Sequence, residues 1–113
     1  MTTPDEAQVS ITDDGGAVTV TGGGALNFLN AKEFGEGLKQ ASKTADSVTV
    51  DLRPAVFIDT QIVQDLGMAA VALMDRGKRL RVVITQTAYP LRVLKISGFE
   101  QIMDIDVEPS GQV

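Results

Sequence analysis

The sequence contains no cysteine, no histidine and no tryptophan, and only one tyrosine. Without cysteine or histidine the chain has no disulfide, no thiolate nucleophile and no Ser-His dyad, and any metal ion would have to be held by oxygen atoms alone. With Tyr89 as the single tyrosine, there is no tyrosine- or tryptophan-based platform on which nucleic-acid bases could stack. These absences remove the commonest catalytic and metal-binding side chains, so we expect neither an enzyme nor a bound cofactor.

Long apolar runs and an excess of positive charge are also missing. No run approaches the roughly 18 apolar residues of a membrane span, and the first residues, MTTPDEAQ, have neither the basic region nor the apolar stretch of a signal peptide. The net charge of −5 and the pI near 4.5 oppose binding to phosphate backbones and to anionic membrane surfaces. We therefore expect a cytoplasmic protein that neither inserts into a membrane nor binds nucleic acid.

The apolar pattern alternates between strand and helix along a chain of single-domain length. The 113 residues, 43% of them hydrophobic, predict one domain over residues 1–113, with its core between about residues 9 and 107. Alternating apolar residues on both sides of residues 13–16 predict a β-hairpin. Later apolar patterns predict strands over 48–58, over 80–85 and after Gly98, and helices over 31–42, from Thr60 and around Pro90. This order predicts an α/β fold: a mixed four- to five-stranded sheet, flanked by helices and opened by the hairpin.

Two motifs that resemble ligand sites are better explained as structure. The run Gly22-Gly23-Gly24 follows a strand, but no Lys-Ser/Thr pair comes after it and its spacing fits neither phosphate-binding pattern. We expect these glycines to let the chain pass close to a neighbour. The acidic pairs Asp13-Asp14 and Asp104 with Asp106 suit turns and solvated edges better than a cation site.

Two further groups of residues have the form of helix ends. Asn30 and Glu33 have the spacing of a capping residue and an acid three positions on, which predicts a helix start at Asn30. The basic cluster Arg76, Lys78 and Arg79 follows a predicted helix end, where cations stabilise the negative end of the helix dipole. A docking patch for an acidic partner is the alternative interpretation of this cluster.

The rest of the chain is organised around residues 48–74, VTVDLRPAVFIDTQIVQDLGMAAVALM. Apolar residues as far as Ile58 indicate buried strand, and from Thr60 onward they recur at helical spacing. Asp59 and Thr60 lie at the change. The Thr60 hydroxyl either caps the helix or forms a site, and Asp59 either bonds to backbone N–H groups of the turn or faces a partner.

Residues 48–60, VTVDLRPAVFIDT, resemble the central signature of STAS domains, the sulfate-transporter and anti-sigma-factor-antagonist family. In that signature an apolar strand, Asp-Leu, a short loop and Ile-Asp precede a Ser or Thr. Residues 91–104, LRVLKISGFEQIMD, resemble the family's last helix and closing turn. The resemblance covers nearly the whole domain, from about Val9 to Val107. It implies a sheet of four or five strands flanked by helices, and a regulatory rather than an enzymatic role.

The resemblance also implies a switch. In anti-anti-sigma factors the hydroxyl after Ile-Asp accepts phosphate from a partner kinase that is also the anti-sigma factor, and by position this hydroxyl belongs to Thr60. The implied partner is therefore an anti-sigma factor and serine/threonine kinase of the ATP-binding type, and the implied partner-binding residues are Asn27, Asp59, Thr60 and Gln61. A helix N-terminus tolerates a phosphate, whose charge would change how this surface meets a partner.

The chain departs from the family pattern at two positions. Ile62 stands where the family commonly has glycine, and Asn27 stands where an acid would lie after the second strand. A threonine acceptor without the glycine is more similar to the STAS domains of stressosome-type scaffolds, which assemble with other STAS proteins, or to soluble STAS subunits of lipid-transporting ABC systems. An accessory transporter subunit would dock on a nucleotide-binding subunit through the basic edge Arg76–Arg81, and its Thr60 would be an unphosphorylated helix cap.

The sequence leaves two further alternatives open. Another hydroxyl than that of Thr60 could carry the phosphate, with three candidates: Ser10, Thr85 and Thr87. Three apolar residues near the candidate site belong either to the core, which we favour, or to a partner surface: Leu26, Phe28 and Leu29.

Overall fold

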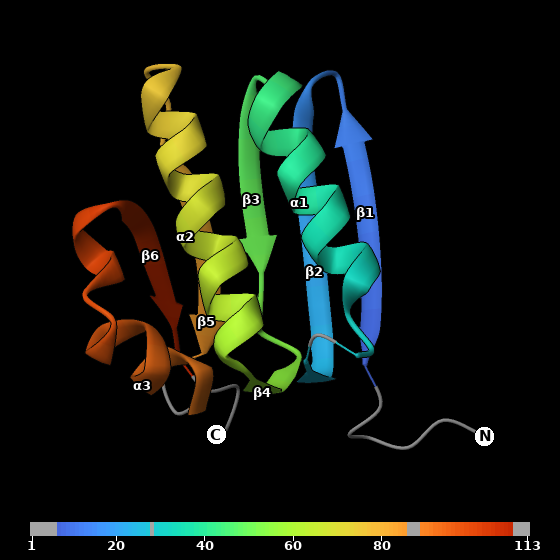
Figure 1. The fold of residues 1–113 in the computed structure, drawn as a ribbon, viewed down its shortest axis with the longest axis vertical. Helices are drawn as coiled ribbons and strands as arrows, with labels where there is room; N and C mark the ends of the chain where they lie inside the picture. Colours follow the sequence, from blue (N-terminus) through green and yellow to red (C-terminus); the bar gives the residue numbers. More distant parts are fainter. Residues whose placement is uncertain (1–6, 28, 86–88, 110–113) are drawn as a thin grey trace.

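The computed structural model describes residues 7–27, 29–85 and 89–109, which form one mixed sheet and three α-helices (Figure 1). The strands are β1 (Gln8–Asp14), β2 (Ala17–Leu26), β3 (Ser47–Asp51), β4 (Ala55–Ile58), β5 (Leu80–Thr85) and β6 (Met103–Glu108). The helices are α1 (Lys32–Thr44), α2 (Thr60–Asp75) and α3 (Tyr89–Ile96), with a 3₁₀ turn at Phe99–Gln101. The strand order is β1-β2-β3-β5-β6, and β4 pairs with β2. Only β1 and β2 are antiparallel among the described strands, so the predicted opening hairpin and α/β class are confirmed.

The three helices pack on one face of the sheet and bury the core beneath them. Figure 1 shows α1 and α2 side by side in front of β2, β3 and β5, with α3 beside the lower part of α2. Val20 of β2, Phe34 of α1 and Leu66 of α2 are completely buried between the two layers. Apolar and polar side chains alternate along the strands because the opposite face of the sheet is polar. Thr19 and Thr49 are paired on that face. The period-2 pattern of the sequence therefore reflects a sheet that is covered on one side.

The predicted strand over residues 48–58 is two strands, which brings the number to six within the described chain. The break falls at Arg53-Pro54, where Arg53 donates from its backbone N–H and its guanidinium to the Asp51 carboxylate over 2.8 to 3.0 Å. Pro54 has no N–H for the sheet, and its carbonyl instead accepts from the Gly24 N–H at 3.0 Å. From Thr21 to Leu26, β2 advances by five residues, whereas the segment paired with it, from Asp51 to Ile58, advances by seven. The paired segment therefore contains two extra residues.

The start of α1 differs from the prediction. Asn30 does not cap this helix, whose N-cap residue is Ala31 and which has no side-chain cap. The Asn30 side chain turns back instead: its Nδ2 donates to the Ala25 carbonyl at 3.0 Å, and its Oδ1 accepts from the Asn27 N–H at 3.0 Å. An asparagine can bond in either direction, and here the end of β2 supplies both partners. Asn30 therefore fixes the turn before α1 rather than the helix itself.

The ends of α1 and α2 are joined by Arg76. Its guanidinium donates to the carbonyl oxygens of Ser42 at 2.9 Å and Ala45 at 2.8 Å, at the C-terminus of α1. These carbonyls belong to the last turn, where intrahelical donors are missing. The sequence predicts that Arg76 stabilises the end of its own helix, α2, and in the structure it caps the C-terminus of α1 instead. Gly77 follows with a positive φ of 76°, a conformation that suits glycine just after the end of a helix.

Candidate functional site

The C-terminal ends of β2 and β4 place the predicted site residues at one edge of the sheet. Leu26 pairs with Ile58, and the Asp59 N–H donates to the Leu26 carbonyl at 3.1 Å. Asn27 and Asp59 follow these two strands directly, so they lie side by side although they are far apart in the sequence. Thr60 comes next, as the first residue of α2. This edge is the candidate site.

Asp59, and not Thr60, caps α2. The Asp59 Oδ1 accepts from the Ile62 N–H at 3.1 Å, and the Asp59 carbonyl accepts from the Val63 N–H at 3.1 Å. The alternative in which Thr60 is the cap is therefore wrong. Thr60 is exposed, and its hydroxyl makes no hydrogen bond to any residue that the structure describes. Its oxygen is free to react or to meet a partner.

The electrostatics around the Thr60 hydroxyl suit an anionic group. The first N–H groups of a helix have no intrahelical partners and form the positive end of its dipole. The first turn of α2 itself holds no acidic side chain, and the Asp59 carboxylate before it bonds to the Ile62 N–H. A phosphate on Thr60 would thus meet a favourable helix end, which it would share with the Asp59 carboxylate.

Asn27 shapes the loop that borders the site. Its Oδ1 accepts from the Leu29 N–H at 2.9 Å and from the Asn30 N–H at 3.2 Å, and its backbone carbonyl accepts from the Ala31 N–H at 2.9 Å. This is the Asx type of turn that asparagine and aspartate favour. The half-buried Asn27 therefore holds the backbone between β2 and α1 in place.

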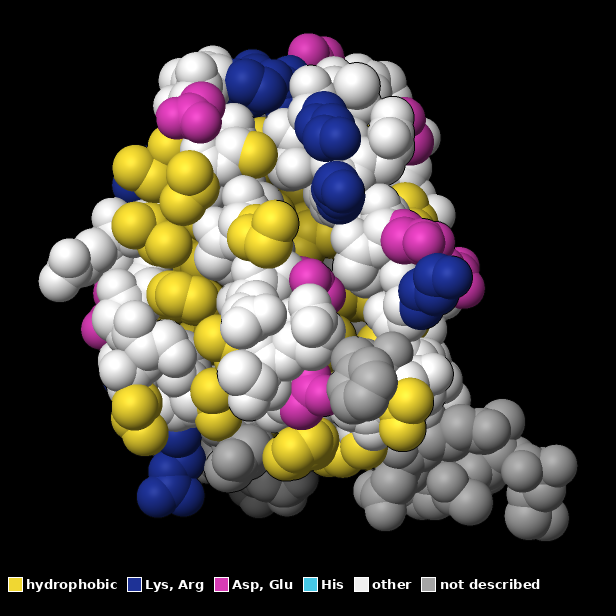
Figure 2. Space-filling view, viewed as in Figure 1, with side chains coloured by type: hydrophobic (Ala, Val, Ile, Leu, Met, Phe, Trp, Pro, Cys, Tyr) yellow, Lys and Arg dark blue, Asp and Glu magenta, His cyan; other side chains and the backbone are white. Residues whose placement is uncertain are grey.

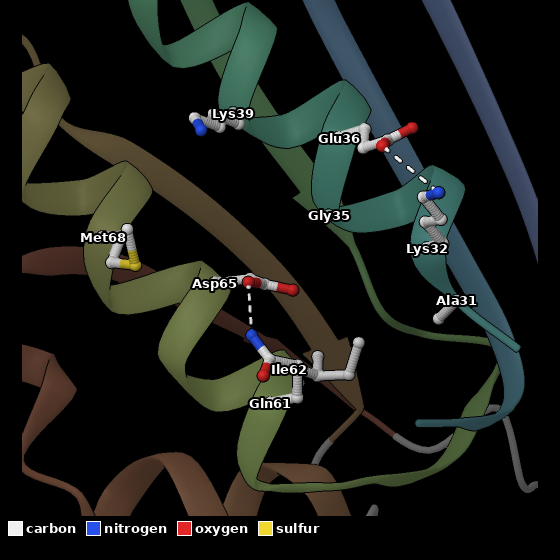
Figure 3. Close-up of a pocket in the computed structure, with 9 residues that line it drawn as sticks. All are labelled: Ala31, Lys32, Gly35, Glu36, Lys39, Gln61, Ile62, Asp65 and Met68. Atoms are coloured by element: carbon white, nitrogen blue, oxygen red, sulfur yellow. Dashed lines mark hydrogen bonds and ion pairs between the residues drawn. The ribbon is translucent and has the colours of Figure 1, made fainter. Parts of the chain in front are cut away.

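Gln61 points to a carboxylate that the sequence analysis missed. The Gln61 Nε2 donates to the Asp65 Oδ1 at 3.1 Å, and Asp65 faces α1 at Gly35 (Figure 3). Burial is the main cause that raises the pKa of Asp65; the hydrogen bond from Gln61 lowers it, and the charge of Asp59 raises it further. An acid four residues after a glutamine is an ordinary helix-surface pair, so only the packing of α1 distinguishes Asp65 from a solvated residue.

A groove of about 370 Å³ lies between α1 and α2 and opens beside Gln61. It is lined by Lys32, Gly35 and Lys39 from α1 and by Gln61, Asp65 and Met68 from α2 (Figure 3). It contains no nucleophile activated by a base, and no group of three or more acidic side chains among the described residues is arranged to hold a metal ion.

The basic edge of the chain is engaged within the fold. Arg79 bonds to Asp104 at 2.8 Å and Arg81 to Asp106 at 2.6 Å, across the parallel strands β5 and β6. Arg76 is bonded to the end of α1. The Asp104 and Asp106 carboxylates pair with these arginines, so much of the positive charge of the basic edge is balanced within the fold.

The remaining predicted residues divide between core and surface. Leu26 is completely buried and Leu29 is 80% exposed, while Phe28 lies outside the described residues. Ile62, which replaces the family's glycine, is 1% exposed and packs in the core, so its β-branched side chain does not crowd the surface around Thr60. Among the alternative acceptors, two are described and one, Thr87, lies outside the described residues: Ser10 is exposed on β1 and Thr85 is half-buried at the end of β5.

Comparison with known proteins concerns the fold. No family model matches the sequence, and no curated protein matches it. An anti-sigma factor antagonist from Mycobacterium paratuberculosis superposes with a TM-score of 0.77 at 17% identity, over 94% of this chain and 90% of that one. An anti-sigma-factor antagonist (STAS) domain protein from Planctomyces limnophilus superposes with a TM-score of 0.69 at 10% identity, over 88% of this chain and 90% of that one. A protein from Thermotoga maritima superposes with a TM-score of 0.65 at 16% identity, over 88% of this chain and 86% of that one.

At these identities the likeness establishes the fold. The chain has the fold of a STAS domain, as its two sequence motifs predict. The helices that the structure describes include none with both the length and the apolar character needed to cross a membrane.

Proposed function

We propose that this chain is a regulatory protein-binding domain of the anti-sigma-factor-antagonist type, switched by phosphorylation of Thr60. The observation that carries the proposal is the position of the cap. Because Asp59 supplies the cap of α2, the Thr60 hydroxyl is exposed and unbonded within the described structure, at the residue where the STAS signature has its phosphoacceptor. The likeness of the fold to anti-sigma factor antagonists supports the same reading.

The proposed partner is an anti-sigma factor that is also an ATP-binding serine/threonine kinase. This partner would bind the edge formed by Asn27, Asp59, Thr60 and Gln61. Ile62 is buried, so its replacement of glycine leaves room for a kinase to approach. A phosphate would add about −1.5 to −2 charges beside Asp59. Phosphorylation should therefore weaken the contact with any partner surface that carries carboxylates or bound nucleotide phosphates.

An accessory role in a membrane transporter receives less support. In that alternative the basic edge Arg76–Arg81 could serve for docking, and the arginines there are already bonded to carbonyls of α1 and to carboxylates of β6. It also requires Thr60 to be the cap of α2, whereas the cap in the structure is Asp59.

Mass spectrometry of the protein purified from its own cells, intact and as peptides, tests the proposal. We expect phosphate on Thr60 and a co-purifying chain with an ATP-binding kinase domain. With that kinase and ATP, Thr60→Ala should abolish phosphate incorporation and Thr60→Ser should retain it, while the matched control Ser10→Ala should behave as the parent. Protein that is unmodified at Thr60 and that co-purifies with transporter subunits would contradict the proposal.

A further inference from the structure

The outer surface of α2 carries apolar side chains where a surface helix normally carries polar ones. Met68 is 66% exposed, Val71 51% and Met74 43%. Their spacing of three residues places them along one side of the helix, which we call the α2 strip. Figure 2 shows apolar side chains gathered over α2 and the segments beside it. Clustered apolar exposure of this kind marks a surface that another molecule covers.

The neighbouring surface of α1 is basic. Lys39 and Lys43 line the space between the two helices and are exposed, and neither forms an ion pair with any described residue. Lys32 has only a 4.0 Å contact with Glu36 between two exposed side chains, which contributes little. In Figure 2, Lys and Arg side chains lie over α1 beside a hollow that separates them from the apolar side chains of α2. A chain with a net charge of −5 thus presents a local basic row at this hollow.

The hollow is continuous. The groove that begins at Gln61 is followed by a second space of about 170 Å³, and Gly35, Lys39, Asp65 and Met68 line both. Ala72 lines the far end. From Gln61 to Ala72, α2 rises by about 16 Å at 1.5 Å per residue, which is about three helical turns. The space therefore has the length of a short helix.

We propose that the groove between α1 and α2 binds an acidic amphipathic helix of a partner protein. Its apolar side chains would pack on Met68 and Ala72, which line the groove, and on Val71 beside them, and carboxylates along one flank would meet Lys39 and Lys43. The Oδ2 atom of Asp65 accepts no hydrogen bond from the described residues, so the partner helix would place a donor such as serine or asparagine opposite it. The groove begins at Gln61, next to the proposed kinase-binding edge, but the Thr60 hydroxyl does not line it, and the inference does not rest on phosphorylation.

Two matched synthetic peptides test the inference on the full chain. Both are about 14 residues long, enough for about four turns, and carry leucines at helical spacing. One has glutamates along the flank and the other has lysines at the same positions. In NMR titrations of the ¹⁵N-labelled protein, we expect the acidic peptide to shift amides of α1 and α2 and to bind at least about tenfold more tightly than the basic peptide. The difference should shrink at high salt, because salt screens exposed charges.

Exchange of the charges on the protein provides the decisive comparison. The double variant Lys39→Glu/Lys43→Glu should invert the preference so that the basic peptide binds more tightly, and Met68→Asp should weaken both peptides. The control Lys95→Glu changes another exposed lysine, on α3, and should leave both affinities unchanged. All these positions are exposed, so the variants should fold, which the NMR spectra report directly.

Three results would overturn the inference: equal binding of both peptides, shifts confined to other elements, or a concentration-dependent dimer in sedimentation that Met68→Asp dissociates. The last result would assign the groove to a second copy of this chain. Thr60→Ala separates this inference from the proposed function, because it adds no charge beside the groove: it should leave peptide binding unchanged while it abolishes phosphate incorporation.

Discussion

The Asp59 carboxylate accepts a hydrogen bond from the backbone N–H of Ile62 at 3.1 Å. This one contact divides two roles between adjacent residues. Asp59 stabilises the start of α2, and Thr60 offers a hydroxyl that the helix does not need. Stability and the proposed phosphorylation switch can therefore be tested separately at neighbouring positions.

Substitution of the cap should affect stability more than substitution of the hydroxyl. We expect Asp59→Ala to lower the free energy of unfolding by about 1 kcal/mol, because an N–H at the helix start loses its acceptor. Asp59→Asn should retain most of the stability, since asparagine is also a good cap. Thr60→Ala should change it by less than about 0.5 kcal/mol, as expected for an exposed position. Urea unfolding measures all three, and an equal loss for Thr60→Ala would contradict the assignment of the cap.

Arg76 should matter more for stability than the other basic residues around it. Arg76→Ala removes two charge-assisted hydrogen bonds to the end of α1, and we expect a loss of about 1 to 2 kcal/mol in the free energy of unfolding. Arg76→Lys should recover only part of this loss, because an ammonium group lacks the planar fork with which arginine reaches both carbonyls. Lys78→Ala is the matched control and should have little effect on the urea midpoint.

The half-buried carboxyl of Asp65 should make the protein less stable as the pH rises. Its pKa is raised above the usual value of 3.8, mainly by burial. The native state therefore holds this proton more tightly than the unfolded chain, so the contribution to stability is complete below the unfolded pKa and is lost as the pH rises through the native pKa. We expect Asp65→Asn to be more stable than the parent at about pH 7, with a difference that shrinks toward about pH 3.5. A difference that stays constant between these values in urea unfolding would contradict this prediction.

The first residue of the glycine run should tolerate no side chain. A Cβ on Gly22 would lie 2.7 Å from Leu26 Cδ1 and 3.1 Å from Phe34 Cε2, inside the core. We expect Gly22→Ala to destabilise the fold by about 1 to 3 kcal/mol, the usual range for an overpacked core. The double variant Gly22→Ala/Phe34→Leu should recover part of that loss relative to the sum of the two single variants, because the smaller leucine leaves space for the new methyl group. Thermal or urea unfolding of the four proteins completes this cycle.

The parts of the fold that depend on local periodicity could be predicted from the sequence. The alternation in β2 and β3 and the helical spacing in α2 follow from burial on one face, and each is visible within about ten residues. The direction taken by the Asn30 side chain could not be predicted, because both neighbouring segments offer partners to an amide. The bonds of Arg76 were also beyond sequence reasoning, since their acceptors are backbone carbonyls of another helix.

The candidate site was predictable to a similar degree. The change of period places Asp59 and Thr60 at the junction of strand and helix, and the STAS resemblance selects the hydroxyl. Which of the two residues caps the helix depends on backbone geometry. The role of Asp65 depends on how closely α1 approaches at Gly35, which no local pattern records.

The turn at Arg53-Pro54 and the bulge at Val56 together act as a spacer of defined parity. Each adds one residue to the strand beside β2: Gly24 pairs with Ala55 after the turn, and Ala25 pairs with Phe57 after the bulge. Since strand side chains alternate between faces, an even addition returns Ile58 to the core face, whereas an odd one would expose Ile58 and turn the start of α2 away from the helical layer. Insertions or deletions within residues 52–57 should therefore be tolerated in pairs and not singly, because the combined length of the turn and the bulge sets the face of the sheet on which Thr60 is presented.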